Sequence, residues 1–282
     1  FFGDINDRDR VGKAFQGQTH VIHLAGFISY RRQDRRRLME VNLAGVRSIV
    51  DAALRVPVQR LIHVSSVGAI GFDKKGRLVD ESAPFNWPPY FHYMTSKHFG
   101  QRVVEDAVRL KGLNAIILNP ASIMGPGDHV RGTPHNQLYN AIYRGLLFGS
   151  FAGGLGVVDV RDVAAIILKG LNRGRVGEKY LLVGANLSYP EILKVIAKQA
   201  ERRVFPFRIP AFFLAAAGLA LEGVSRVAGN KPLLTYAYGR LSGWTTFYDN
   251  SKSRQDFGHE YIPIEDTIRD SCRYFERTFM AS

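Results

Sequence analysis

The sequence predicts an α/β protein with a doubly wound parallel sheet and a smaller C-terminal α+β lobe. Short apolar runs at residues 20–26, 60–64 and 114–118 end in small or polar residues, which is typical of buried parallel strands. Apolar residues recur at helical spacing between these runs, as over residues 34–55. Strands that alternate with helices indicate that successive strands are parallel and joined by helical crossovers. This alternation predicts the α/β class.

The other elements follow in chain order. Residues 1–4 resemble the end of a strand, and Asn6 or Asp7 is placed to cap a helix over residues 8–15. Ser188 and Glu191 have the spacing of a capping box for the helix that follows them. The later predicted elements are helices at 135–147 and 161–172, strands at 157–159, 179–183 and 246–248, and a glycine-rich turn at 153–156.

The composition narrows the class of protein. The chain has 282 residues, of which 46% are hydrophobic and 22% are charged. These values are typical of a globular protein and exclude a disordered or fibrous one. Its single cysteine, Cys272, excludes a disulfide framework. The eight histidines show no zinc-type spacing, so we predict no metal. A reducing, cytoplasmic location is the default expectation.

The formal charge of +13 comes mostly from arginine, which is densest over residues 31–37. This run is either the solvated start of a helix or a surface that attracts an anionic partner. No nucleic-acid motif accompanies it, so we predict no nucleic-acid partner. The longest apolar run, residues 209–221, is shorter than the roughly 20 residues of a membrane-spanning helix. We interpret it as a buried or pocket-lining helix, with membrane-surface contact as the minor alternative, and predict no transmembrane segment.

A tyrosine and a lysine four residues apart, Tyr93 and Lys97, carry the most informative chemistry. On one helix this spacing places the phenol and the ammonium group on the same face. Lowering a phenol pKa from about 10 to about 7 takes roughly 4 kcal/mol, which one nearby ammonium can supply in a partly buried site. Ser65 and Ser66 follow a predicted strand, and Ser66 precedes Tyr93 by 27 residues. Together they predict a proton-transfer site.

Seven ordered blocks resemble one family, the extended short-chain dehydrogenase/reductases of the NAD-dependent epimerase/dehydratase type. Within it, the likeness is to the dihydroflavonol reductase-like and hopanoid-associated sugar epimerase-like group. The blocks are Gly3-Asp4, His23-Leu24-Ala25-Gly26, Val41-Asn42 with Gly45, Val64-Ser65-Ser66, residues 93–97, residues 119–128 and residues 159–164. The resemblance covers nearly the whole chain and implies a Rossmann sheet that binds a dinucleotide.

The resemblance implies a role for each catalytic candidate. Tyr93 would be the general acid/base, and Lys97 would lower its pKa and hydrogen-bond the nicotinamide ribose. Ser66 would polarise the substrate carbonyl or hydroxyl. Asn42 would order the active-site helix and a water near Lys97, the alternative being an amide on a helix surface. Ser65 fits a cofactor-side or structural hydroxyl better than the catalytic one.

The resemblance also implies a cofactor site and a domain division. Residues 1–128 would form the dinucleotide-binding domain. Residues 129–282 would hold the last sheet elements, at about 157–184, and a substrate-binding lobe made of 129–156 and 185–282. The cofactor is NADP or NAD, and analogy with reductases favours NADP. The implied cofactor-binding residues are Asp4, Ile5, Leu24, Ala25, Gly26, Ser65, Tyr93, Lys97, Pro120, Ala121, Ser122 and Ile123.

The family's glycine-rich turn after a first strand does not occur in this sequence. The nearest cluster, at residues 153–156, precedes a predicted strand instead of joining a strand to a helix. Because a βαβ unit takes about 30 residues or more, we expect that the first two strands, on the order of 50 residues, are missing ahead of Phe1.

Three functions remain open. The first is a reductase or dehydrogenase that moves a hydride between the nicotinamide and a ketone or secondary alcohol. The second is a nucleotide-sugar epimerase or dehydratase with tightly bound NAD, for which Arg131, Arg161 and Lys231 are candidate diphosphate ligands. The third is an inactive cofactor-binding protein. The predicted substrate-pocket residues are Phe27, Ile28, Tyr30, Tyr90, Phe91, His92 and Met124. Their apolar character favours a hydrophobic small-molecule ketone, and the resemblance suggests a homodimer.

Overall fold

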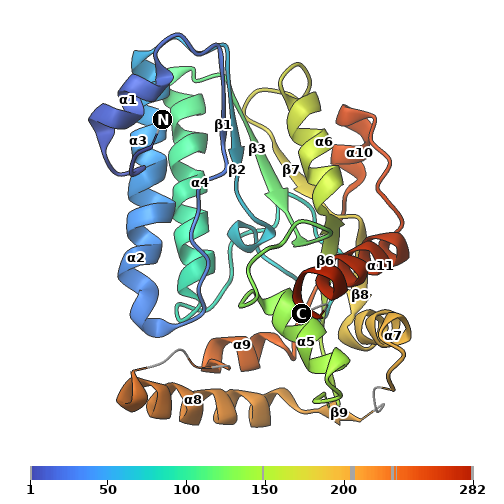
Figure 1. Cartoon of the computed structure of the whole chain (residues 1–282). Helices are drawn as coiled ribbons and strands as arrows, with labels where there is room; N and C mark the ends of the chain where they lie inside the picture. The colour runs from blue at the N-terminus through green and yellow to red at the C-terminus, as the bar shows by residue number, and fades with distance from the viewer. Residues whose placement is uncertain (1, 148, 204–206, 230–231, 233, 281–282) are drawn as a thin grey trace.

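A four-stranded parallel sheet forms the centre of the computed structural model, which describes residues 2–147, 149–203, 207–229, 232 and 234–280. The strand order is β1-β2-β3-β7, and the strands run side by side in Figure 1. Their bounds are β1 His20–His23, β2 Arg60–Val64, β3 Ala115–Pro120 and β7 Lys179–Leu182. All three neighbouring pairs are parallel. The predicted α/β class with a parallel sheet is therefore confirmed.

Helices cover both faces of this sheet (Figure 1). On one face, α1 (Arg8–Phe15), α3 (Val46–Arg55) and α4 (His92–Lys111) enclose a core that includes Leu61. On the other, α6 (Val160–Gly170) and α10 (Ser251–Phe257) enclose a core that includes Ile62. Successive strand residues point to opposite faces, so the apolar run of β2 supplies both cores.

A smaller second sheet carries the C-terminal lobe. β4 (Ser122–Met124) and β10 (Thr245–Thr246) pair parallel to β6 (Gly154–Asp159), and β8 (Ala185–Ser188) pairs antiparallel to it. A separate two-stranded sheet joins β5 (Ser150–Phe151) to β9 (Arg208–Ile209). The surrounding helical segments are α5 Pro134–Tyr143, α7 Tyr189–Gln199, α11 Ile264–Phe275 and the π-helix Glu276–Met280. Since β4 lies in this sheet and β7 in the first, the sheet pairing crosses the proposed boundary at residue 128.

Several predicted caps and ends can be compared with the structure. Of the two predicted capping residues, Asn6 and Asp7, the structure uses Asp7, whose side chain caps α1. Ser188 and Glu191 make both hydrogen bonds of the predicted capping box before α7. Residues 2–4 are not a strand, and Phe1 lies outside the described residues. The glycines at 154 and 156 belong to β6 itself instead of a turn before it, because the backbone there pairs with both β8 and β10.

The predicted helix over residues 34–55 is interrupted. It consists of a 3₁₀ turn (Arg32–Asp34), α2 (Arg35–Met39), a π-helix (Glu40–Gly45) and α3. Gly100 of α4 packs onto this π-segment so closely that a Cβ atom there would lie 2.1 Å from the Asn42 carbonyl oxygen. Such single π-turns are rare and are found mostly at functional sites.

The interpretation of residues 209–221 as a buried helix is wrong. The helix α8 extends over Ala211–Ala228, and only 17% of it is buried in the protein. By length and composition it is the one helix among the described residues that could cross a membrane. It packs on α9 (Tyr236–Leu241) through small residues, so its large apolar side chains point away from the core.

Candidate active site

Tyr93 and Ser66 meet at the end of β2. Ser66 follows that strand and caps a 3₁₀ turn (Val67–Ala69), where its Oγ accepts a hydrogen bond of 3.1 Å from the Gly68 backbone N–H. A Cβ built on Gly68 would lie 3.4 Å from Ser66 Oγ and 3.8 Å from Cε1 of Tyr93. Both side chains therefore lie beside Gly68. Burial raises the pKa of Tyr93, and a hydrogen bond with the Ser66 side chain opposes the rise.

Lys97 lies one helical turn after Tyr93, on the same face of α4. Its side chain is buried, with an exposed fraction of 7% for the residue, and its Nζ donates a hydrogen bond of 3.2 Å to the Val64 carbonyl oxygen. Burial lowers the pKa of Lys97 to about 8. Burial also raises the pKa of Tyr93, and the lowering of that pKa by Lys97 stays a prediction.

Asn42 is a buried amide that ties two segments together. It is 2% exposed, so the alternative of a helix-surface amide is wrong. Its Oδ1 accepts from the Phe27 N–H at 2.8 Å, and its Nδ2 donates to the Phe27 carbonyl at 2.8 Å and to Ser96 Oγ at 2.9 Å. A Cβ on Gly26 would lie 3.5 Å from Asn42 Oδ1 and 3.9 Å from Lys97 Nζ. The asparagine thus holds the chain after β1 against α4, beside the lysine.

A second amide pair supports the serine, and the sequence reasoning did not assign it a role. Asn119, at the end of β3, is fully buried. Its Nδ2 donates to the Ser66 carbonyl oxygen and to Gln101 Oε1, both at 2.7 Å. Gln101 follows Lys97 by four residues on α4, and this spacing was the signal that could have identified it.

An aromatic wall surrounds the tyrosine. The Tyr30 ring contacts Tyr93 edge to face at a centroid distance of 6.0 Å, and Tyr238 at 5.5 Å. Tyr90 meets Tyr236 in the same way at 5.5 Å. Both partners, Tyr236 and Tyr238, lie on α9 of the C-terminal lobe. No signal in the sequence placed this short helix over the site.

The predicted substrate residues divide into two groups. Tyr30, Tyr90 and Phe91 pack in or against one cluster with Tyr93. Met124 instead packs in a separate core with Tyr139 and Ile142, because β4 belongs to the second sheet. The remaining three candidates lie at the rim: Phe27 under the Arg37 guanidinium, Ile28 with 55% exposure, and His92 at the first position of α4.

The predicted cofactor-binding residues, of which Asp4 and Ile5 are the ones expected near the adenine, differ in their exposure. Asp4 is exposed and accepts a hydrogen bond of 2.9 Å from the Asn6 N–H. Ile5 packs against the π-segment, where a Cβ on Gly45 would lie 2.8 Å from its Cγ2. Leu24 is 62% exposed and Ile123 39% exposed. Pro120 and Ala121 are buried and Ser122 is half-buried, at the ends of β3 and β4.

Three buried polar atoms fit a dinucleotide at the carboxyl end of the sheet. Within the described part of the chain, His23 Nε2, Ser65 Oγ and Asn119 Oδ1 have no hydrogen-bond partner. They follow or end β1, β2 and β3 at the edge where open α/β sheets bind their ligands. A dinucleotide carries hydroxyl, amide and phosphate groups that can pair with such atoms.

His23 packs against a second histidine, His63, with 2.9 Å between the two Nδ1 atoms. Burial lowers the pKa of His23 to about 4, so His23 is a neutral histidine in the core.

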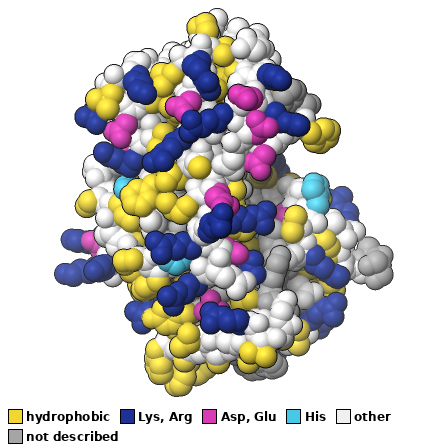
Figure 2. All heavy atoms as spheres, turned by 90° about the vertical axis from the view of Figure 1, so that its left-hand side faces the viewer, with side chains coloured by type: hydrophobic (Ala, Val, Ile, Leu, Met, Phe, Trp, Pro, Cys, Tyr) yellow, Lys and Arg dark blue, Asp and Glu magenta, His cyan; other side chains and the backbone are white. Residues whose placement is uncertain are grey.

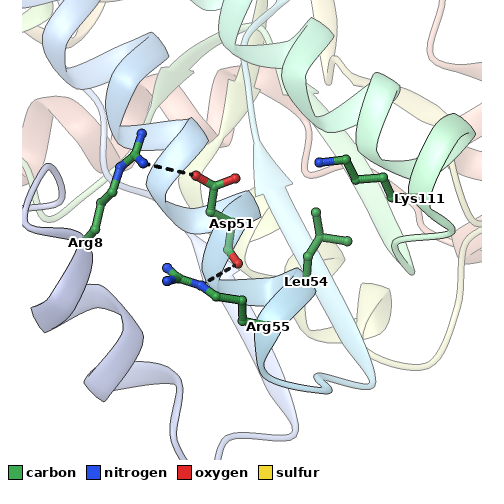
Figure 3. A pocket seen from close by; sticks show the side chains of 5 residues that line it. All are labelled: Arg8, Asp51, Leu54, Arg55 and Lys111. Carbon is green, nitrogen blue, oxygen red and sulfur yellow. Dashed lines mark hydrogen bonds and ion pairs between the residues drawn. The ribbon is translucent and has the colours of Figure 1, made fainter.

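A surface hollow at the other end of α4 is separate from this site. Figure 3 shows it between α1, α3 and α4, lined by Arg8, Asp51, Leu54, Arg55 and Lys111. Lys111 ends the helix on which Tyr93 is the second residue. At about 1.5 Å per residue, the two are roughly 27 Å apart. The hollow takes no part in the proton-transfer site.

The comparisons with known proteins agree with this geometry. A model of the NAD dependent epimerase/dehydratase family matches residues 1–183, which is more than half of the 282 residues. The chain belongs to this family. This epimerase/dehydratase family protein is an enzyme of the extended short-chain dehydrogenase/reductase type, whose members bind NAD or NADP.

Two curated relatives match nearly the whole chain. Sterol demethylase protein B of Methylococcus capsulatus is 29% identical over 282 residues, covering 99% of this chain and 85% of that protein. A Synechocystis sp. protein provisionally named dihydroflavonol 4-reductase is 28% identical, covering 97% and 80%. The match to the dihydroflavonol reductase-like group was predicted from the motifs.

Solved structures share the fold. The crystal structure of gox2253 superposes with a TM-score of 0.83 at 28% identity, covering 98% of this chain and 84% of that one. RMD from Pseudomonas aeruginosa, complexed with NADPH, has a TM-score of 0.75 at 17% identity, which supports the fold alone.

Proposed function

We propose that this protein is an NAD(P)-dependent ketoreductase or alcohol dehydrogenase for a bulky, apolar substrate. The observation that carries the proposal is the position of Tyr93, which faces Ser66 on one side and an aromatic wall on the other. The named relatives support the substrate class, because sterols and dihydroflavonols are multi-ring, largely apolar molecules.

The residues of this chain would act on the substrate oxygen. Bound NAD(P) supplies or accepts the hydride. In the reducing direction, the Tyr93 hydroxyl gives its proton to the carbonyl oxygen, and the Ser66 hydroxyl donates a hydrogen bond to the same oxygen. The Lys97 ammonium, close to the same helix face, would stabilise the tyrosinate that forms. Leu24, Ala25, Gly26, Ser65 and residues 120–123 would line the cofactor.

The nucleotide-sugar alternative is less well supported by the cations available. A diphosphate needs free cationic donors. Arg161 is already paired with Asp159 at 2.7 Å and with Asp270 at 2.9 Å. Arg131 donates to the Phe279 carbonyl oxygen and lies over its ring. The third candidate, Lys231, lies outside the described residues.

Four finer expectations join this proposal. We propose NADP as the preferred cofactor and a cytoplasmic location, in keeping with the buried, unpaired thiol of Cys272. We also propose a homodimer, which size-exclusion chromatography with light scattering would test. The division at residue 128 into a cofactor domain and a substrate lobe is part of the same proposal.

Replacing the tyrosine tests the reaction. Tyr93→Phe should lower kcat for ketone reduction by about 10³-fold, as expected for loss of a general acid, while the Kd for NADPH stays unchanged. The matched control is Tyr248→Phe, which removes a buried phenol hydroxyl from the sheet core and should keep its activity. The assay follows NADPH absorbance with a panel of apolar ketones and nucleotide sugars.

The outcomes separate the alternatives. Net consumption of NADPH with ketones supports the reductase. Isomerisation of a nucleotide sugar without net consumption would instead identify an epimerase, and equal activity of Tyr93→Phe and the wild type would remove Tyr93 from the mechanism.

A further inference from the structure

The helix α8 has its small residues inside and its large apolar residues outside. Its buried residues are Ala215, Gly218 and Ser225. The large side chains on the opposite face are between 38% and 91% exposed. They are Phe212, Phe213, Leu219, Leu221, Val224 and Val227. In an ordinary surface helix the apolar stripe faces the core, so this arrangement is the reverse of the usual one.

Close packing against α9 fixes this orientation. A Cβ on Gly218 would lie 2.4 Å from the Thr235 carbonyl group, and one on Gly239 would lie 2.5 Å from the Ala215 backbone nitrogen. The two helices therefore touch backbone to backbone, and a rotation that brought Phe213 inward would have no space. The only carboxylate of α8, on Glu222, also points inward and accepts a hydrogen bond of 3.1 Å from the Tyr236 N–H.

Positive charges outnumber negative ones in the segment that contains this face. Residues 201–240 contain five arginines and one lysine against two glutamates, the exposed Glu201 and the inward-pointing Glu222. Arg226 is the one charged residue exposed on α8 in the described chain, and Arg202, Arg203 and Arg208 are exposed ahead of it. In Figure 1, α8 lies across the bottom of the molecule below α9. Figure 2 shows hydrophobic side chains gathered at this bottom edge, with Lys and Arg side chains above them.

We propose that α8 docks this protein onto the surface of an anionic phospholipid bilayer, lying parallel to it. Aromatic and aliphatic side chains enter the interface, while the surrounding arginines contact the acidic headgroups. Because α9 packs along the inner side of α8, the helix lies on the bilayer and does not span it. A second copy of the chain fits this face less well, since a two-fold contact would place Arg226 and its neighbours opposite like charges.

Docking in this way places the aromatic site close to the lipid. The helix α9 carries Tyr236 and Tyr238 to the wall around Tyr93, and α8 covers the other side of α9. The site would thus lie about one helix diameter, roughly 10 Å, above the interface. The docking proposal itself does not depend on the proposed reaction, because its test measures binding alone.

Vesicle flotation tests the proposal. The wild type should float with vesicles of phosphatidylcholine mixed with phosphatidylglycerol, less with phosphatidylcholine alone, and less when salt is added. In the double variant Phe213→Ser/Leu219→Ser the partition coefficient should fall about tenfold for each large apolar side chain removed. The matched control is Leu110→Ser/Leu168→Ser, on α4 and α6, since Leu168 is 63% exposed and Leu219 is 62% exposed.

Each result decides the question. A wild type that stays unbound with anionic vesicles, or equal flotation of the two double variants, overturns the proposal. Equal binding to neutral vesicles without a salt effect removes the role of the arginines and overturns the anionic part. A change from dimer to monomer in Phe213→Ser/Leu219→Ser, with unchanged flotation, would show that a second copy covers the face. Thermal unfolding of each variant shows that its fold is intact.

Discussion

Replacing Asn42 by alanine tests whether the buried amide positions the catalytic helix. The substitution removes three side-chain hydrogen bonds, two to the Phe27 backbone and one to Ser96. At about 1 kcal/mol net for each bond, the free energy of unfolding should fall by about 3 kcal/mol. The chain after β1 would then be free to move relative to Lys97, and a displacement of about 1 Å can cost about 100-fold in rate. We therefore expect kcat to fall by about that factor.

A matched variant separates positioning from general destabilisation. Asn136 of α5 is also buried, at 3% exposure, and its amide donates two hydrogen bonds to backbone carbonyl groups, at 3.2 Å and 3.0 Å. Asn136→Ala should lose about 2 kcal/mol of stability while its kcat stays near that of the wild type. Urea unfolding and steady-state reduction of the same ketone measure both quantities.

Two results would refute this reasoning about Asn42. If Asn42→Ala and Asn136→Ala lose activity equally, the effect comes from lower stability and not from position. If Asn42→Ala unfolds at the same urea concentration as the wild type, its three hydrogen bonds do not contribute as the distances indicate.

Two further predictions concern the same helix. Burial lowers the pKa of Lys97 from 10.5 to about 8, so between these values the unfolded chain binds one proton more than the folded one, and stability rises with pH by about 3 kcal/mol. Lys97→Met should therefore be more stable than the wild type at pH 7 and lose this advantage toward pH 10.5. A difference in unfolding free energy between the two proteins that stays the same at every pH, measured by urea unfolding, would contradict this. Gly100→Ala should lower stability by about 1–3 kcal/mol, because its Cβ would overlap the Asn42 carbonyl, whereas Gly12→Ala, with open space around it, should raise stability by about 0.5–1 kcal/mol. Equal effects of the two alanines in thermal unfolding would show that the close contact is absent.

The strands and the main helices could be predicted because their signals are local. The apolar run of β2 fills two cores, and Ser188 and Glu191 form a cap within four residues. The π-turn at Glu40–Gly45 could not be predicted, because it depends on the approach of Gly100 from a distant helix. Local sequence patterns therefore predict which segments are helices and strands. A distortion within a helix can be predicted only when the residue that packs against it is known.

The candidate site shows the same division. Ser66, Tyr93 and Lys97 belong to recognisable motifs, whereas Asn119 lies in the motif at residues 119–128, whose pattern does not reveal that its side chain holds Ser66. Tyr236 and Tyr238 were missed because they lie more than 140 residues after Tyr93 in a six-residue helix with no periodic pattern. Hydrophobicity alone misplaced α8, since the same apolar run fits a buried helix and an exposed one.

Tyr93 is surrounded by two kinds of contact, directed hydrogen bonds and aromatic edge-to-face contacts. Amides fix the proton-transfer groups to one another, as Asn119 does for Ser66 and α4. The C-terminal lobe reaches the same tyrosine through ring edges from Tyr238 by way of Tyr30, and such contacts tolerate sliding and replacement better than directed hydrogen bonds. Exchanging α9 for the corresponding segment of another family member would therefore change the wall around Tyr93 while the acid and its supports keep their geometry, on the condition that the new segment keeps a glycine at the position of Gly239, where α9 packs on α8.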